Sequence, residues 1–373
     1  MPSLPIRAVP ASLIAGGELW QVLDTMPDPR GRRGRRHRLP VILVCAVAAV
    51  LAGARSFVAI GEWVAHQSPA ALLQLGVDSA GPGESTIRRV ITRLDADVFD
   101  QVLGALMWTR TMTCAGRRVI AIDGKTVRGA RTRTAAAPHL VAALDHRAGS
   151  VLGQLAVAAK SNEIPAVQQL LGLFDLVGTV ITVDAMHTQT DTADLIVAGR
   201  ADYLFTVKGN QPTLFQQLKA LPWAKVPAHR ATETGHGRRT TRTIKVIDAP
   251  AWVTFTGAAQ IAQVRRTVTR NTKKTVEVVY LITSAHHTAA PPATLAGWIQ
   301  GHWSIENQLH WVRDVTFDED RSQIRTGNAP QVMATLRSTA ISLLRLAGWT
   351  NIAAGLRHHA RDPDLTLKLV LTW

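Results

Sequence analysis

Cysteine is scarce in this sequence of 373 residues, which contains only Cys45 and Cys114. Two cysteines exclude a disulfide scaffold and a zinc module built on cysteine ligands. Long apolar runs are also lacking: the longest, from Val41 to Ala52, has twelve residues, whereas a membrane-spanning helix needs about 20. Residues 1–20 do not show the charged-then-apolar order of a signal peptide. We therefore expect a soluble, cytoplasmic protein with no membrane partner.

Negative charge is also in short supply. Asp and Glu total 27 against 42 Lys and Arg, which gives a formal net charge of +15. Such an excess favours a polyanionic partner, and nucleic acid is a better candidate than a membrane surface. Residues 30–38 alone hold six arginines, and so dense a run is expected to be extended, either as a solvated loop or against DNA phosphates. Because 46% of the residues are apolar and 18% charged, a disordered chain is excluded.

Motifs for nucleotide binding and acyl transfer are absent. The sequence has no Walker A loop, no Gly-x-Gly-x-x-Gly strand turn and no Gly-x-Ser-x-Gly elbow. A histidine metal site at His286-His287 or His358-His359 is not favoured, because adjacent side chains point in different directions. We expect no nucleotide cofactor.

The first third of the chain has a helical pattern. Val41–Ala52 is apolar on all sides and predicts a buried helix, and a second short helix is expected from Phe57 to His66. Ser85-Thr86 could cap a further helix that carries arginines on one face. A small basic helical domain of this kind fits the binding of DNA ends.

From residue 117 the pattern changes to alternating strands and helices. Strands are expected at 118–122, 139–144, 151–158, 179–183 and 203–207, and helices at 164–174, 188–198 and 211–221. This order indicates a mixed α/β sheet. Residues 223–290 then alternate Arg and Thr with Val and Ile, which predicts a half-buried sheet with a cationic outer face. Two long helices are expected at about 293–313 and 329–347.

Three acidic residues stand out within this pattern. Asp123 and Asp184 each end an apolar strand, where active groups gather in α/β sheets, although a turn-forming aspartate is the simpler alternative. Glu306 has the helical spacing that places it on one face with His302, His310 and Arg313. A surface row of salt bridges would explain that face equally well, but the neighbouring tryptophans argue for a buried helix, in which an unpaired Glu is costly.

Oxygen ligands from three acids suit Mg²⁺ or Mn²⁺ rather than zinc. Two such ions, roughly 4 Å apart, can activate the attacking oxygen and stabilise the leaving oxygen of a phosphodiester. A cationic chain with an acidic metal pocket therefore points to the cutting of DNA or RNA.

Four segments in order resemble the DDE transposases of bacterial insertion sequences, in particular the branch that includes the H-repeat-associated proteins. They are Ala121-Ile-Asp-Gly-Lys-Thr-Val-Arg-Gly129, Thr182-Val-Asp-Ala-Met-His-Thr-Gln189, Asp202-Tyr-Leu-Phe-Thr-Val-Lys-Gly-Asn-Gln-Pro212 and the segment from His302 to Asp320. The resemblance covers residues 20 to 350. It implies an RNase H-like mixed sheet flanked by helices, with a β-rich insertion between the second and third acids and an N-terminal all-helical domain.

This resemblance also implies the domain limits. They are an N-terminal helical, end-binding domain (1–115), the first part of the RNase H-like catalytic core (116–222), a basic β-rich insertion (223–290), the helical part of the core with the Glu (291–350) and a tail (351–373).

The resemblance makes Asp123, Asp184 and Glu306 a metal-binding catalytic triad for two Mg²⁺ or Mn²⁺ ions. Where the related signature has Tyr, Arg, Glu and Lys, this chain has Ile299, His302, Glu306 and Arg313. Arg keeps the phosphate-binding charge, whereas Ile cannot replace a tyrosine hydroxyl. The residues expected to contact DNA are Lys125, Arg128, Lys208, Asn210, Gln211, Arg238, Arg239, Arg265, Arg266, His302 and Arg313.

The expected function follows from this site. The chain is predicted to bind the ends of an insertion sequence, cleave the phosphodiesters by metal-activated water and join the 3′-OH ends to target DNA. Its expected partners are double-stranded DNA and a second copy of itself in the DNA complex, in the bacterial nucleoid. Two alternatives are a transposase-derived DNA-binding regulator without catalysis and a nuclease that cuts without joining.

Overall fold

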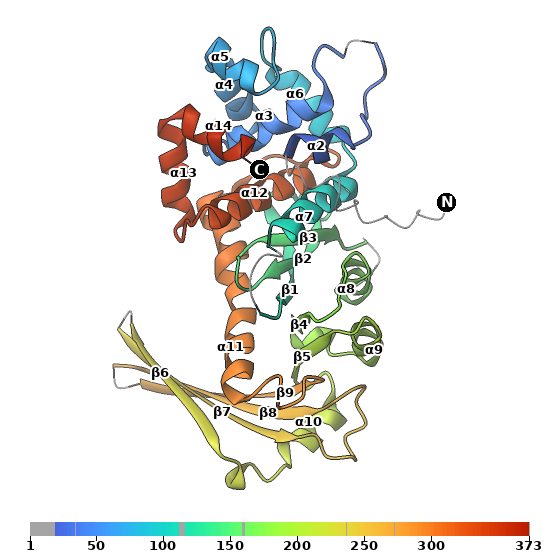
Figure 1. Ribbon diagram of the computed structural model, residues 1–373, viewed down its shortest axis with the longest axis vertical. Coiled ribbons are helices and arrows are strands. Elements are labelled where there is room, and N and C mark those ends of the chain that lie inside the picture. Colours follow the sequence, from blue (N-terminus) through green and yellow to red (C-terminus); the bar gives the residue numbers. More distant parts are fainter. Residues whose placement is uncertain are drawn as a thin grey trace. The chain divides into compact units, whose positions relative to one another are not determined.

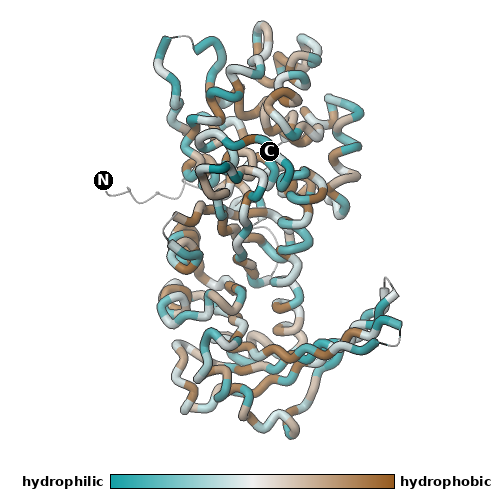
Figure 2. Tube along the Cα trace, turned by 180° about the vertical axis from the view of Figure 1, so that it is seen from behind, coloured by the Kyte–Doolittle hydropathy of each residue, from teal (hydrophilic) through white to brown (hydrophobic). Residues whose placement is uncertain are grey.

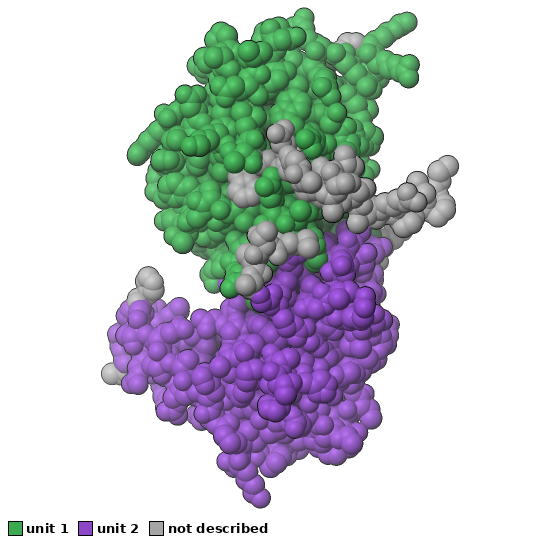
Figure 3. All heavy atoms as spheres, in the orientation of Figure 1, with its two compact units in different colours: residues 1–115, 124–162, 305–373 green, residues 116–123, 163–304 purple. Residues whose placement is uncertain are grey.

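The computed structural model describes residues 19–33, 35–111, 116–158, 161–235, 237–271 and 273–372. The chain divides into two compact units, coloured green and purple in Figure 3. Unit 1 comprises residues 1–115, 124–162 and 305–373, and unit 2 comprises residues 116–123 and 163–304. Cys114 and, within the arginine run, Gly34 lie outside the described residues. No helix in the described ranges is long and apolar enough to cross a membrane.

The N-terminal part of unit 1 is helical, as the sequence predicted. Its helices are α2 (Leu19–Asp24), α3 (Leu39–Leu51), α4 (Phe57–Ala65), α5 (Pro69–Gln74), α6 (Glu84–Arg93) and α7 (Ala96–Thr111). Every residue of α3 is buried, because this helix is apolar on all sides. The expected cap of α6 is wrong: Gly83 is the N-cap, and Ser85 and Thr86 lie inside the helix.

The C-terminal part of unit 1 packs on these helices and on a β-hairpin. The hairpin consists of β2 (His139–Asp145) and β3 (Val151–Ala156), and three helices follow later in the chain, α12 (Ala329–Leu346), α13 (Ile352–Arg361) and α14 (Pro363–Leu371). Helix α12 contacts α3, α7 and β3 and is buried along most of its length. Helix α7 lies so close to β3 that a Cβ on Gly104 would be 2.3 Å from the carbonyl oxygen of Leu152.

Unit 2 is built on three parallel strands. They are β1 (Val119–Thr126), whose residues up to Asp123 belong to this unit, β4 (Val180–Val183) and β5 (Asp202–Val207). Helices α8 (Glu163–Leu171) and α9 (Thr190–Ala198) lie between them in sequence. The strands are nearly continuous apolar runs, as expected where both faces of a parallel sheet are covered. Asp123 lies within β1 rather than at its end, because the ladder continues to Thr126.

The basic β-rich segment extends the same sheet. Strands β6 (Ala228–Gly235), β7 (Arg238–Asp248), β8 (Gln260–Arg270) and β9 (Lys273–Thr283) are antiparallel, and β9 pairs with β5. Within unit 2 the strand order is β1-β4-β5-β9-β8-β7-β6 (Figure 1). The mixed sheet flanked by helices, with a helical N-terminal region, confirms the predicted fold class.

Helices cover both faces of the inner half of this β segment. Helix α11 (Pro292–His302) places Trp298 and Ile299 against Ile244 and Leu281. On the other face, α10 (Pro212–Lys219) and the turn η3 (Trp223–Lys225) bring the rings of Phe215 and Trp223 to 5.5 and 6.0 Å from that of Tyr280. The strands change from largely brown where helices cover them to mostly teal toward their free ends (Figure 2).

The expected helix at 293–313 is not a regular α-helix. Helix α11 ends at His302, and the chain continues through two π-helical turns, η4 (Glu306–His310) and η5 (Val312–Thr316), to the short turn η6 (Glu319–Arg321). Wide turns of this kind are rare and often occur at functional sites. They also change which side chains share a face, which bears directly on Glu306 and Arg313.

Candidate functional site

Asp123 and Asp184 lie side by side on neighbouring strands of unit 2. Strands β1 and β4 pair in parallel up to Ile122 and Val183, so the two aspartates are the next residues in register. Neighbouring strands are about 4.8 Å apart. The Asp184 side chain is 55% exposed, and its Oδ1 lies 3.6 Å from the Nζ of Lys208, which follows β5. The Asp184 carboxylate and the Lys208 ammonium therefore meet where β4 and β5 end.

The chain after Asp184 is held by two amide side chains that were expected to touch DNA. Asn210 Nδ2 donates to the carbonyl oxygen of Ala185 at 2.7 Å, and Gln211 Nε2 donates to that of Thr188 at 2.8 Å. Residues 185–187 form a single turn between these two carbonyls. Both amides thus fix the backbone that follows Asp184.

His302, at the end of α11, is buried beneath Asp184. Its Nδ1 lies 3.1 Å from the hydroxyl of Thr182 on β4. Burial lowers the pKa of His302 to about 4, although the negative charge of Asp184 acts in the opposite direction. The ring is therefore neutral at pH 7. This placement corrects the expectation that His302 contacts a phosphate, because the side chain has almost no exposed surface.

Glu306 opens the π-helical turn η4 in unit 1. Its carboxylate is 69% exposed, and Oε2 lies 3.2 Å from Nδ1 of the buried His310. The predicted spacing of four residues between these two side chains therefore does produce a contact. Glu306 presents an accessible oxygen ligand whose orientation is supported by an imidazole.

Arg313 does not share the face of Glu306. It is completely buried in unit 1, where Nη2 lies 2.8 Å from Oε1 of Glu319 and Nη1 donates to Gln154 Oε1 at 3.0 Å. Arg337 pairs with the other oxygen of Glu319 at 2.9 Å. The prediction that Arg313 holds DNA phosphate is thus corrected: the turn η5 directs its guanidinium into an internal ion triad.

Lys125 and Arg128 follow Asp123 along the chain and differ in exposure. Lys125 is 8% exposed, with Nζ 2.5 Å from Asp314 Oδ1 and 3.8 Å from Asp320 Oδ1, so its charge is used inside unit 1. Arg128 is 78% exposed and lies 3.6 Å from Asp320 Oδ2. Of these two expected DNA contacts, Arg128 has a guanidinium available to a ligand.

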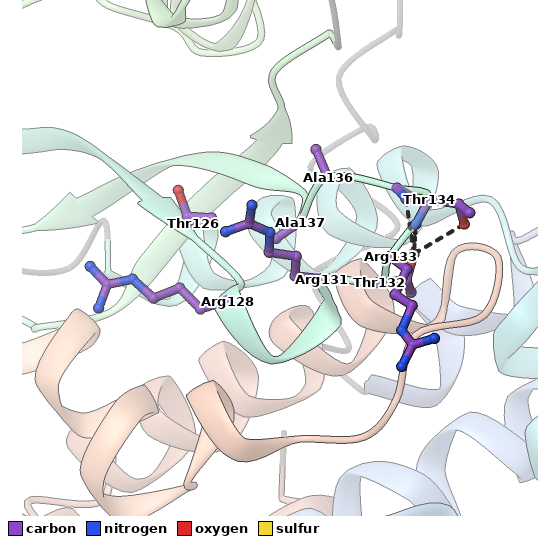
Figure 4. A pocket seen from close by; sticks show the side chains of 9 residues that line it. Thr126, Arg128, Arg131, Thr132, Arg133, Thr134, Ala136 and Ala137 are labelled. Carbon is purple, nitrogen blue, oxygen red and sulfur yellow. Dashed lines mark hydrogen bonds between the residues drawn. The ribbon is translucent and has the colours of Figure 1, made fainter.

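Arg128 also lines a basic pocket of about 610 Å³ within unit 1. The sequence interpretation missed two further arginines of this pocket, Arg131 and Arg133, although the run of alternate arginines was a visible signal. Thr132 Oγ1 accepts hydrogen bonds from the backbone of Thr134 and Ala135 and so stabilises the loop. In Figure 4 the guanidinium groups of Arg128 and Arg131 lie on the side of Thr126, while that of Arg133 points away from them. The lining contains no acidic residue.

The four expected phosphate ligands of the β segment divide between the two faces of the sheet. Arg239 and Arg265 are exposed on one face, whereas Arg238 and Arg266 alternate with them and lie on the other. Arg266 Nη1 lies 3.8 Å from Glu277 Oε2.

Comparison with known proteins gives the family. Residues 115–343 match the model described as "Transposase DDE domain", and residues 20–107 match one described as "DDE_Tnp_1-associated". The chain belongs to the DDE transposase family. Asp123, Asp184 and Glu306 all lie in the part matched by the domain model. The predicted resemblance is therefore confirmed.

This transposase is similar to bacterial chains along nearly its whole length. It is 34% identical to "Putative transposase YncI" of Escherichia coli O157:H7 over 88% of this chain and 87% of the relative. It is also 34% identical to "H repeat-associated putative transposase YhhI" of E. coli K12, over 92% and 94%. A solved structure of the piggyBac transposase synaptic complex with hairpin DNA aligns with 96% of this chain and 78% of that chain at 10% identity and a TM-score of 0.42.

Proposed function

We propose that this transposase cleaves DNA at the ends of an insertion sequence and joins the freed 3′-OH ends to target DNA, with Asp123, Asp184 and Glu306 as the ligands of two divalent cations. The observation that carries the proposal is that Asp123 and Asp184 each directly follow the last pair of the parallel ladder between β1 and β4, Ile122↔Val183. Asp184 follows the carboxyl end of β4, and the carboxyl ends of strands are where α/β proteins place reactive groups.

The position of Glu306 in the chain supports its place as the third ligand. Glu306 lies with Asp123 and Asp184 in residues 115–343, which match the transposase domain model. Its carboxylate is exposed and contacts the buried His310. We propose that Glu306 joins the aspartates to complete the site, with His310 orienting its carboxylate.

The donor set fits hard divalent cations. It consists of carboxylate oxygens, and Asp184 and Glu306 are more than half exposed, so that Mg²⁺ or Mn²⁺ could reach them. When bound, a pair of such ions activates the attacking oxygen and stabilises the leaving oxygen of the phosphodiester. Lys208 neutralises Asp184 in the free protein and is well placed to take a phosphate oxygen when DNA is bound.

The remaining residues hold this arrangement and the DNA. Neutral His302 packs beneath Asp184 through Thr182, while Asn210 and Gln211 fix the turn after it. Arg128, with the arginines of its pocket, contacts the DNA backbone by charge-assisted hydrogen bonds. The exposed arginines of α6, Arg88, Arg89 and Arg93, support end binding by the N-terminal helices. Because two ends have to be paired, the DNA complex contains a homodimer.

The experiment that tests the proposal compares Asp184→Asn with wild type on end-containing duplex, Mg²⁺ and a target plasmid. We expect the variant to lose nicked and joined products while its affinity for end DNA stays within about twofold of wild type. The matched control is Asp194→Asn on the exposed face of α9, which should keep all three activities. Equal loss of binding and cleavage in Asp184→Asn would contradict the metal role.

Wild-type protein that binds end DNA without nicking it would indicate a regulator. Wild-type protein that nicks DNA without joining it would indicate a nuclease.

A further inference from the structure

Strands β6–β9 run beyond the helices that cover their inner halves, and we call these four strands the arm. We infer that the arm binds the phosphate backbone of duplex DNA with one of its two faces, and that on the other face carboxylates of the chain pair with two of the arginines. The inference rests on the proposed action on DNA, and it assigns opposite roles to arginines that are neighbours in sequence.

The register of the arm assigns each side chain to a face. Strand β7 pairs with β8 from Arg238↔Arg270 to Asp248↔Gln260 without a shift, and β8 pairs with β9 in the same uninterrupted way. Residues directly opposite in an antiparallel pair lie on the same face, and successive residues alternate. Ile244, Val264 and Leu281 pack against α11, so their face, here called the α11 face, is fixed by the core.

The α11 face carries the carboxylates of the arm. All three acidic residues of the four strands, Glu233, Asp248 and Glu277, belong to it by register. Arg242 Nη1 lies 2.9 Å from Glu233 Oε2, and the amide of Gln300 on α11 donates to the same carboxylate at 3.2 Å. Arg266 on this face is paired with Glu277. Arg242 and Arg266 therefore have carboxylate partners within the chain, whereas Arg238 and Arg270, at the outer end of this face, are exposed.

The opposite face, here called the open face, has cations and hydroxyls but no carboxylate. Its cations are Arg230, Arg239, Lys245, Arg265 and Lys274. Its hydroxyl residues are Thr232, Thr234, Thr241, Thr243, Thr267 and Thr269. Lys245 is held by the carbonyl oxygen of Trp223 at the covered end, whereas Arg239 and Arg265 are exposed. Guanidinium and hydroxyl donors without competing acids are the groups that bind phosphate oxygens.

The length of the arm suits a duplex. The uncovered outer half of an eleven-residue strand extends about 18 Å at roughly 3.3 Å per residue, about half of the ~34 Å of one turn of B-DNA. Duplex DNA can therefore lie along the open face and place several phosphates within reach of its arginines. A partner that needs apolar burial is less suitable, because most side chains of the outer half of this face are Thr, Arg or Lys.

The test compares two double variants that remove the same charge from the same two strands. Arg239→Ala/Arg265→Ala removes two exposed arginines of the open face, and Arg238→Ala/Arg270→Ala removes two exposed arginines of the α11 face. Binding to a 40-base-pair duplex is measured by fluorescence anisotropy from 50 to 300 mM salt without divalent metal, so the readout does not depend on cleavage.

We expect the open-face variant to bind about 10- to 100-fold more weakly, with a salt slope reduced by about 2, since each phosphate contact contributes roughly 0.9 to that slope. The affinity of the α11-face variant for the duplex should change by less than threefold.

An equal loss of affinity in both variants, or a loss confined to the α11-face variant, would overturn the inference. Lack of binding by wild type would overturn it together with the proposed function, whereas binding without cleavage would contradict the proposed catalysis alone.

A footprint on the wild-type protein guards against misfolding of the variants. Bound duplex should protect Arg239 and Arg265 from an arginine-modifying reagent and leave Arg238 and Arg270 reactive. Protection of the second pair alone, or of all four residues equally, would contradict the assignment of faces.

Discussion

Arg313 and Glu319 form a fully buried ion pair in the segment that follows Glu306, with Nη2 2.8 Å from Oε1. Arg337 binds the second oxygen of the same carboxylate, and Gln154 on β3 accepts from Arg313. The triad therefore ties the π-helical segment after Glu306 to α12 and to the hairpin. We interpret Arg313 as a positioning residue for that segment.

Arg313→Ala should lower the free energy of unfolding by about 3–5 kcal/mol, because it leaves a buried carboxylate with a single cation. The measurement is denaturant unfolding at pH 7. Arg128→Ala, which removes an exposed arginine of the same unit, is the control and should change stability by about 0.5 kcal/mol or less. A loss below about 1 kcal/mol for Arg313→Ala would show that the triad does not hold the segment.

Acid should weaken the triad in a defined pH range. Burial by itself raises the pKa of Glu319, but Arg313 and Arg337 outweigh it and hold that pKa at about 2, below the ordinary value near 4.3. The unfolded chain therefore binds this proton more readily, and the stabilisation is complete above about pH 5 and is lost as the pH falls toward 2. The free energy of unfolding measured between pH 6 and 3 should show this decline. Glu319→Gln should be less stable than wild type at pH 6, and its stability should fall less between pH 6 and 3.

Asp100 on α7 should give the opposite pH dependence. Burial raises its pKa to about 7, although hydrogen bonds from Thr335, Gln331 and Gln154 act to lower it. The folded protein then holds the proton more tightly than the unfolded chain, so stability falls as the pH rises from about 4 to about 7. Asp100→Asn should remove this decline when unfolding is measured at pH 5 and 8. Asp78→Asn, which removes an exposed carboxylate that is not among the groups acting on Asp100, should preserve it.

Replacing two helical glycines with alanine should change the stability of the protein in opposite directions. Gly104→Ala forces a methyl group to within 2.3 Å of the backbone oxygen of Leu152, and overpacking of this kind costs about 1–3 kcal/mol. Gly297 on α11 has no atom within 4 Å of the added carbon, so Gly297→Ala should stabilise by up to about 1 kcal/mol. Thermal unfolding of the two variants measures both effects, and a destabilised Gly297→Ala with an unchanged Gly104→Ala would contradict the packing of α7 on β3.

Local pattern was sufficient to predict several parts of the fold and site. The all-apolar run at Val41–Ala52 predicted a buried helix, and α3 is buried at every residue. The apolar runs that lead to Asp123 and Asp184 predicted two strands of one sheet, and these strands pair in parallel up to the residues before the aspartates, Ile122 and Val183. The motifs correctly predicted the family, because they combine residue type with order along the chain.

Features that depend on distant contacts were not predictable in this way. The pairing of β9 with β5 joins segments about 75 residues apart, and no local signal in either strand specifies it. The burial of Arg313 depends on two π-helical turns and on Glu319 and Arg337, so regular helical spacing gave the wrong face. Alternation along β7 and β8 assigns neighbouring arginines to opposite faces, but only the packing of Ile244 and Val264 on α11 showed which arginines lie on the α11 face.

The continuous ladder from β5 to β6 limits how evolution or engineering can alter the length of the arm. Because its strands share backbone hydrogen bonds with the strand that leads to Lys208, the arm is not a module that could be excised at a linker. Shortening has to remove matched residues from paired strands in steps of two, since a single deletion would exchange the two faces beyond it. Length variants of this family that preserve function should therefore differ in this region by even numbers of residues per strand.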